Sequence, residues 1–152
     1  MHIQLQRICV PVDFSDTSRA ALKYAKALAE AFGARLHILH VLVNWIPETD
    51  VPVSPQVYEQ FEQSARKQLE TVLLPEERTK YRAELDIVNG TSEFLEIIRY
   101  AREKEIDLLV MGTHGRGAIA HILLGSVAEK VVRKAPCPVL TVRHPEHEFV
   151  MP

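Results

Sequence analysis

Three glycines and a serine in the second half of the chain have the spacing of a phosphate-binding loop. Gly112-Thr-His-Gly115 is followed, after nine further residues, by Gly125-Ser126. Glycine lets the backbone approach a ligand closely, and the free N–H groups at a helix N-terminus attract anions without a basic side chain. An apolar run, residues 107–111, precedes this segment and a helical pattern follows it. The sequence therefore predicts a strand, a phosphate-binding loop and a helix.

Other interpretations of these residues remain open at this point. The glycines could serve only to make turns, because short glycine motifs have many false positives. Ser126 and Glu129 fit the Ser-x-x-Glu capping box, in which the serine hydroxyl is used on its own helix. Asp13 follows the first apolar run and could cap the next helix, although Ser15 can do the same. We expect Asp13 to contact a ligand, because carboxylates in such crevices are often functional.

Several classes of site are excluded by the motifs. No Walker loop is present. Residues 115–120 match a dinucleotide fingerprint, but they follow the predicted fourth strand rather than the first, which excludes nicotinamide binding. A phosphorylated receiver is a poor match, because the third and fifth strands end at Asn89 and Arg143. The histidines form no convincing metal site, since His37 and His40 face opposite sides of a strand.

Composition describes an ordinary globular domain. The chain has 152 residues, of which 47% are hydrophobic and 25% charged, and its formal net charge is −2. Without a basic excess, nucleic acid is not an expected partner. No apolar run could span a membrane and no signal peptide is recognisable, so we expect a cytoplasmic protein. The two cysteines, Cys9 and Cys137, are expected to be reduced structural thiols.

Strand and helix patterns alternate along the whole chain, which predicts an α/β fold. We expect a single domain at residues 1–144, followed by a tail at 145–152. Its core would be a doubly wound, mostly parallel five-stranded sheet with helices on both faces, as in Rossmann-like folds. The first and fourth strands are nearly unbroken apolar runs, so they are predicted to be central neighbours. Ligands in such sheets bind at the carboxyl ends of strands where the winding reverses, which would bring Asp13 and Gly112 together.

Finer patterns give further expectations. Residues 82–88 alternate polar and apolar, as an edge strand does, and Asn89-Gly90 is predicted to join that strand to a helix rather than form a hairpin. Apolar residues at helical spacing predict the buried faces of three helices. These predicted contacts include Phe32 in the first helix, Val57, Phe61 and Val72 in the second, and Val127, Val131 and Val132 in the last.

The order of these motifs resembles the universal stress protein family. The resemblance rests on Val10-Pro-Val-Asp13, the strand end His40-Val41, residues 107–115, Leu124–Glu129 and the closing strand 136–142, and covers essentially the whole chain. Some family members bind ATP and others have lost the glycine motif. This chain has the spacing of the binders, so the resemblance implies ATP as ligand, which some members bind together with Mg²⁺ or Mn²⁺.

Positions carried over from the family imply a nucleotide site. Pro11, Val12, Asp13 and Val41 would line the adenosine pocket, and Met111 and Gly112 would lie against the ribose and first phosphate. The phosphates would be held by Gly115, Arg116, Gly125, Ser126 and Val127, although the flexible run 116–118 leaves the contact of Arg116 open. The resemblance also implies a homodimer through the last strand, at Val139, Leu140, Thr141 and Val142.

The sequence thus favours a cytoplasmic, ATP-binding stress-response protein that acts as a sensor or adaptor. A slow ATP hydrolase on the same fold is one alternative, for which Asp13 is the obvious candidate base. A ligand-free interaction module is the other, and the intact glycine motif argues against it.

Overall fold

Five parallel strands form one sheet in the order β3-β2-β1-β4-β5. The computed structural model describes residues 1–44, 53–114 and 124–143. The strands are β1 (Arg7–Pro11), β2 (Arg35–Val43), β3 (Glu84–Gly90), β4 (Leu108–Gly112) and β5 (Val139–Val142). The predicted α/β architecture is confirmed, including β1 and β4 as central neighbours and β3 as an edge strand.

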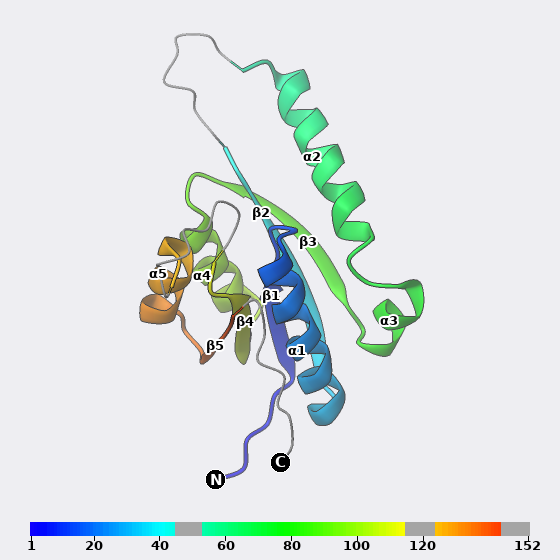
Figure 1. Ribbon diagram of the computed structural model, residues 1–152, viewed down its shortest axis with the longest axis vertical. Coiled ribbons are helices and arrows are strands. Elements are labelled where there is room, and N and C mark those ends of the chain that lie inside the picture. Colours follow the sequence, from blue (N-terminus) through cyan, green and yellow to red (C-terminus); the bar gives the residue numbers. More distant parts are fainter. Residues whose placement is uncertain (45–52, 115–123, 144–152) are drawn as a thin grey trace.

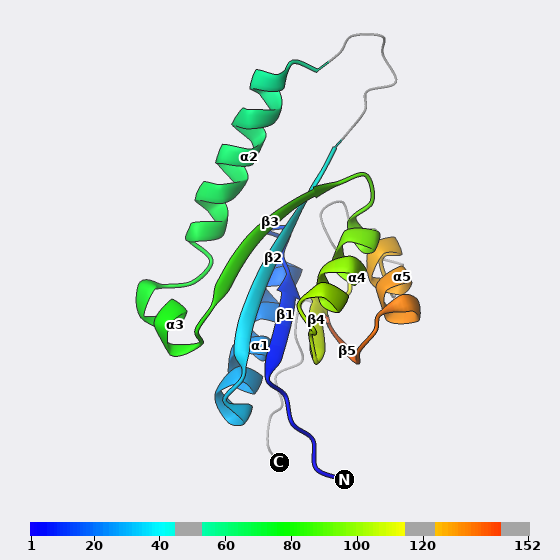
Figure 2. The same ribbon diagram turned by 180° about the vertical axis from the view of Figure 1, so that it is seen from behind.

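Helices cover both faces of the sheet (Figures 1 and 2). They are α1 (Asp16–Phe32), α2 (Pro55–Glu70), α3 (Pro75–Lys80), α4 (Glu93–Glu103) and α5 (Ser126–Lys134). The first three lie on one face, and α4 and α5 lie on the other. Alternate residues of β1 therefore enter two separate cores: Ile8 and Val10 pack on the α1–α2 side and Cys9 on the α4–α5 side.

Local signals explain the limits of α1 and the contact of β1 with β4. The Ser15 hydroxyl accepts a hydrogen bond from the Ser18 N–H (3.2 Å), which caps the helix. Gly33, at a φ of 67°, ends the helix in the left-handed conformation that glycine adopts readily. The Asp107 carboxylate accepts the N–H groups of Gln6 and Arg7, which fixes the beginning of β1 against β4.

Some predicted core positions are wrong. Phe32, Phe61 and Val132 are 45%, 59% and 47% exposed. In α2 only Ala65 and Leu69 are buried, so the first half of the helix presents Val57 and Phe61 to solvent. Helical periodicity identifies the inward side of a helix but not how far the sheet extends beneath it. The short helix α3 was not predicted, whereas the strand-to-helix connection at Asn89-Gly90 is confirmed.

Candidate functional site

The predicted crevice lies where β1 and β4 end and the winding of the sheet reverses. Asp13 follows β1, and Met111 and Gly112 end β4. A Cβ on Gly112 would lie 2.6 Å from Cγ2 of Thr17, in the first turn of α1. The missing side chain therefore lets α1 pack directly over the end of β4. This contact holds the two sides of the crevice together.

A bond across the glycine segment brings its two ends into contact. The Gly125 N–H donates to the Thr113 carbonyl oxygen at 2.6 Å. A Cβ on Gly125 would lie 3.0 Å from the same oxygen, so this position requires a small residue for close approach. Gly115 and Arg116, which are expected to hold phosphates, lie outside the described residues. The described backbone nevertheless places the end of β4 beside the start of α5.

Ser126 is the first residue of α5, and Gly125 occupies the capping position. The alternative in which Ser126 caps its own helix in a box with Glu129 is therefore wrong. Glu129 instead forms an exposed ion pair with Arg133 at 2.9 Å. Val127 is partly buried against the α4–α5 core. The exposed Ser126 hydroxyl and the first N–H groups of α5 form the end of a helix that can attract an anion.

The turn after β1 is held in one conformation by several contacts. The Asp13 carboxylate accepts the Ser15 N–H at 3.0 Å, while Ser15 itself caps α1. Phe14 has a φ of 66°, which is uncommon for a residue with a large side chain. Its ring packs on His40 with centroids 4.6 Å apart, and Nδ1 of His40 lies 2.7 Å from the Val12 carbonyl oxygen. Such constrained turns occur preferentially at functional sites.

The residues expected around adenosine divide between the two faces of the sheet. Val41 and Met111 belong to the α4–α5 core, whereas Val12 packs in the α1–α2 core. The Val12 N–H also donates to the Leu39 carbonyl oxygen at 2.8 Å. A ligand beside Val41 and Met111 would therefore contact the backbone of Val12 rather than its side chain. Pro11 ends β1 and is buried.

Glu93, in the first turn of α4, lies close to Asp13, which the sequence did not indicate. Burial raises the pKa of its carboxyl group, and the nearby Asp13 carboxylate raises that pKa further. A carboxyl group with a raised pKa can act as a hydrogen-bond donor as well as an acceptor. Asp13 follows β1 and Glu93 follows β3, so no local pattern connects them.

A cluster that the sequence did not predict lies near the start of β3. His37, Glu84 and Asp86 have ligand atoms within 4.8 Å of one another, a grouping that could hold a metal ion. These groups already bind other side chains. Glu84 contacts Arg35 at 2.9 Å and Lys104 at 3.3 Å, and the Tyr100 hydroxyl, 3.0 Å from Nδ1 of His37, donates to Asp86. We interpret the cluster as a partly buried polar network that joins α4 to β2 and β3.

Comparison with known proteins identifies the family. The family model described as the universal stress protein family matches residues 4–143. Universal stress protein MJ0531 of Methanocaldococcus jannaschii is 34% identical over 146 residues, covering 94% of this chain and 85% of that protein. The chain belongs to the universal stress protein family.

Solved structures of the family share the fold. The structure of MJ0577, also from M. jannaschii, has a TM-score of 0.78 and 29% identity, and the match covers 93% of this chain and 98% of that one. A universal stress protein in complex with cAMP has a TM-score of 0.66 and 26% identity over the same shares of the two chains. Within the described residues, no helix of this family member is long and apolar enough to cross a membrane.

Proposed function

We propose that this universal stress protein binds an adenine nucleotide, with ATP as the physiological ligand, and acts in the cytoplasm as a stress-response sensor or adaptor. The observation that carries the proposal is the Gly125–Thr113 hydrogen bond, which sets the N-terminus of α5 beside the ends of β1 and β4. Asp13 and Glu93 add carboxyl groups to the same region. The solved cAMP complex of a family member supports an adenine nucleotide as ligand.

Phosphates at the start of α5 would meet backbone donors and the Ser126 hydroxyl. Glu129 lies in the first turn of this helix and disfavours a nearby polyphosphate, although its ion pair with Arg133 offsets part of that charge. A divalent cation, Mg²⁺ or Mn²⁺, bound with the nucleotide would reduce the remaining repulsion. We therefore expect ATP to bind more tightly when one of these ions is present.

Calorimetric titration with MgATP tests the assignment. Ser126→Ala should weaken binding by about tenfold, as the loss of one charge-assisted hydrogen bond of about 1.5 kcal/mol predicts. Ser64→Ala, an exposed serine of α2 away from the crevice, is the matched control and should bind like wild type. Equal affinity in wild type and Ser126→Ala would contradict the placement of the phosphates at α5. Absence of any binding by wild type would contradict the proposed function itself.

A further inference from the structure

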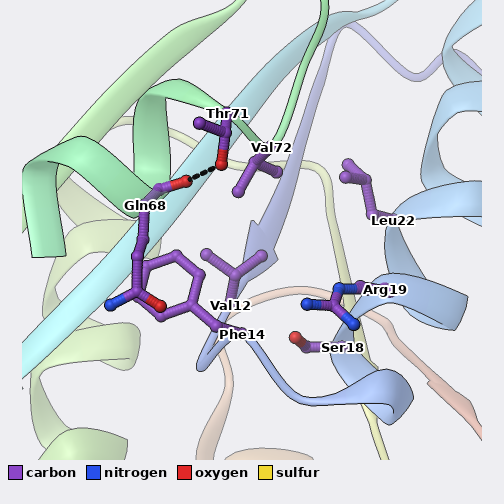
Figure 3. Close-up of a pocket in the computed structure, with 8 residues that line it drawn as sticks. All are labelled: Val12, Phe14, Ser18, Arg19, Leu22, Gln68, Thr71 and Val72. Atoms are coloured by element: carbon purple, nitrogen blue, oxygen red, sulfur yellow. Dashed lines mark hydrogen bonds between the residues drawn. The ribbon is translucent and has the colours of Figure 1, made fainter.

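A second cavity lies on the α1–α2 face of the sheet, away from the proposed phosphate site at α5. Its volume is about 360 Å³, within the range of small-molecule sites. Val12, directly after β1, and Leu22 of α1 form apolar walls, and Val72, which follows α2, also lines the cavity (Figure 3). Val41 and Met111, expected to line the adenosine pocket, pack on the other face. Of the residues expected around the nucleotide, Val12 alone also lines this cavity, through a side chain that packs in the α1–α2 core. The cavity therefore adjoins the proposed nucleotide site at Val12 and lies on the opposite face of the sheet from Val41 and Met111.

Phe14 gives this cavity a preformed aromatic wall. The contact of its ring with His40, and the 2.7 Å contact of His40 with the Val12 carbonyl oxygen, hold the ring in place. A wall that is already ordered loses little conformational entropy when a ligand binds. An apolar ring or chain can therefore pack between Phe14, Leu22 and Val72.

The polar groups around the cavity favour an anion. In Figure 3 the guanidinium group of Arg19 points from α1 toward Val12 and Phe14. The described lining contains no acidic side chain, and its other polar members are Ser18, Gln68 and Thr71. Arg19 pairs with Asp16 at 2.9 Å, but both side chains are about 70% exposed, and such pairs contribute little stability. A ligand carboxylate or sulfonate can replace Asp16 and bind the guanidinium fork with two hydrogen bonds.

We propose that this cavity binds a small amphipathic organic anion. The apolar body of the ligand packs between α1 and α2 against Phe14, and its anionic group pairs with Arg19. The site does not depend on nucleotide binding, so it can be tested in the nucleotide-free protein.

Two fluorescent probes of nearly the same shape provide the test. 1-Anilinonaphthalene-8-sulfonate carries an anionic group, and N-phenyl-1-naphthylamine lacks it. We expect saturable binding of one sulfonate probe per chain. Arg19→Gln should weaken binding of the sulfonate at least about tenfold and leave the neutral probe unchanged. Lys23→Gln, which removes a cation of α1 that does not line the cavity, is the matched control and should leave both probes unchanged.

A second variant shows whether the probe binds in this cavity, and it leaves the buried core unchanged. Thr71 lies at the exposed rim, and Thr71→Trp should fill the cavity and abolish binding of both probes. Circular dichroism and thermal unfolding show that each variant is folded. Absence of saturable binding, an equal loss in Arg19→Gln and Lys23→Gln, or full binding by folded Thr71→Trp would each overturn the proposal. If ATP displaces the probe and Thr71→Trp still binds the probe as wild type does, the probe lies in the nucleotide crevice. That result would also overturn the proposal.

Discussion

At the scale of single residues, Gly112 has a packing role that its place in the glycine motif does not reveal. The position a Cβ would occupy is 2.6 Å from Cγ2 of Thr17 and 3.0 Å from its Cβ. The glycine is therefore required by the contact between α1 and β4, whether or not a phosphate lies beside it. A loss of nucleotide binding in a Gly112 variant would not by itself identify a ligand contact.

Gly112→Ala should destabilise the protein by about 1–3 kcal/mol, the usual effect of overpacking. Thr17→Ser removes the closest methyl group, so the double variant should recover part of this loss. The midpoint of urea unfolding measures each effect, with Thr17→Ser alone as the reference. If Gly112→Ala unfolds at the wild-type midpoint, the packing argument is wrong.

Glu93 makes stability depend on pH through its raised pKa. The folded state favours the protonated carboxyl group of Glu93. Its contribution to the free energy of unfolding is therefore complete below the usual pKa of about 4.5 and is lost as the pH rises through the raised pKa. Glu93→Gln is neutral at every pH. The variant should therefore be more stable than wild type at pH 7, and the difference should disappear below about pH 4.

Urea unfolding at several pH values measures this difference. Glu103→Gln, which removes an exposed carboxyl group of the same helix, is the matched control variant. A difference that grows as the pH falls would contradict the raised pKa.

At the scale of elements, the backbone groups that β5 presents at the open edge of the sheet indicate how a second copy could pair with it. The carbonyl oxygens of Pro138 and Val142 accept hydrogen bonds from Leu109 and Thr113 on the β4 side. Because the direction of backbone groups alternates along a strand, the outward N–H groups belong to Val139 and Thr141. Leu140 is 37% exposed and offers an apolar side chain beside this edge. We propose an antiparallel pairing of β5 with β5 of a second copy.

Thr141→Pro should remove an outward donor and give monomers while the sheet stays intact, because proline is tolerated at an open edge. Leu140→Pro and Val142→Pro are less informative, because they remove inward donors to β4 and would destabilise the sheet itself. Light scattering at micromolar concentration measures the oligomeric state, and circular dichroism verifies folding. A monomeric wild type, or a dimeric Thr141→Pro, would contradict the β5 interface.

At the scale of the whole molecule, we expect the described crevice to bind a nucleotide rather than hydrolyse it. The only carboxylate predicted as a base, Asp13, accepts the Ser15 N–H at 3.0 Å and lies with Glu93 at the proposed adenosine end. The motif supplies no lysine of the Walker type for the terminal phosphates. Phosphoryl transfer depends on positioning and charge stabilisation, so we expect at most a weak rate. Bound nucleotide would then act by shifting the conformations available to a partner.

Multiple-turnover phosphate release with Mg²⁺ or Mn²⁺ measures this rate, which should stay well below about 1 per second, the lower end for ordinary enzymes. Gly125→Val controls for contaminating phosphatases, because its side chain would collide with the Thr113 carbonyl and disrupt the site. A metal-dependent rate of about 1 per second or faster, lost in this variant, would favour the hydrolase.

The sequence by itself determined the fold class, the family and the order of the elements apart from the short helix α3. Apolar periodicity and glycine positions are local properties, so the alternation of strands and helices follows from short stretches such as β1 and α1. The central position of β1 and β4 also follows, since only strands covered on both faces are apolar throughout. The same reasoning predicted that Asp13 and Gly112 follow neighbouring strand ends, and the order of the strands confirms that β1 and β4 are neighbours.

Only the tertiary structure decided which groups meet. The Gly125–Thr113 bond, the approach of Glu93 to Asp13, and the turning of Val12 away from Val41 depend on how separate elements pack. The outward direction of the Thr141 N–H depends on the register of β5 against β4. These relations join residues far apart in the chain. For β5, a one-residue shift in register would turn the Thr141 N–H toward β4 without changing any local pattern.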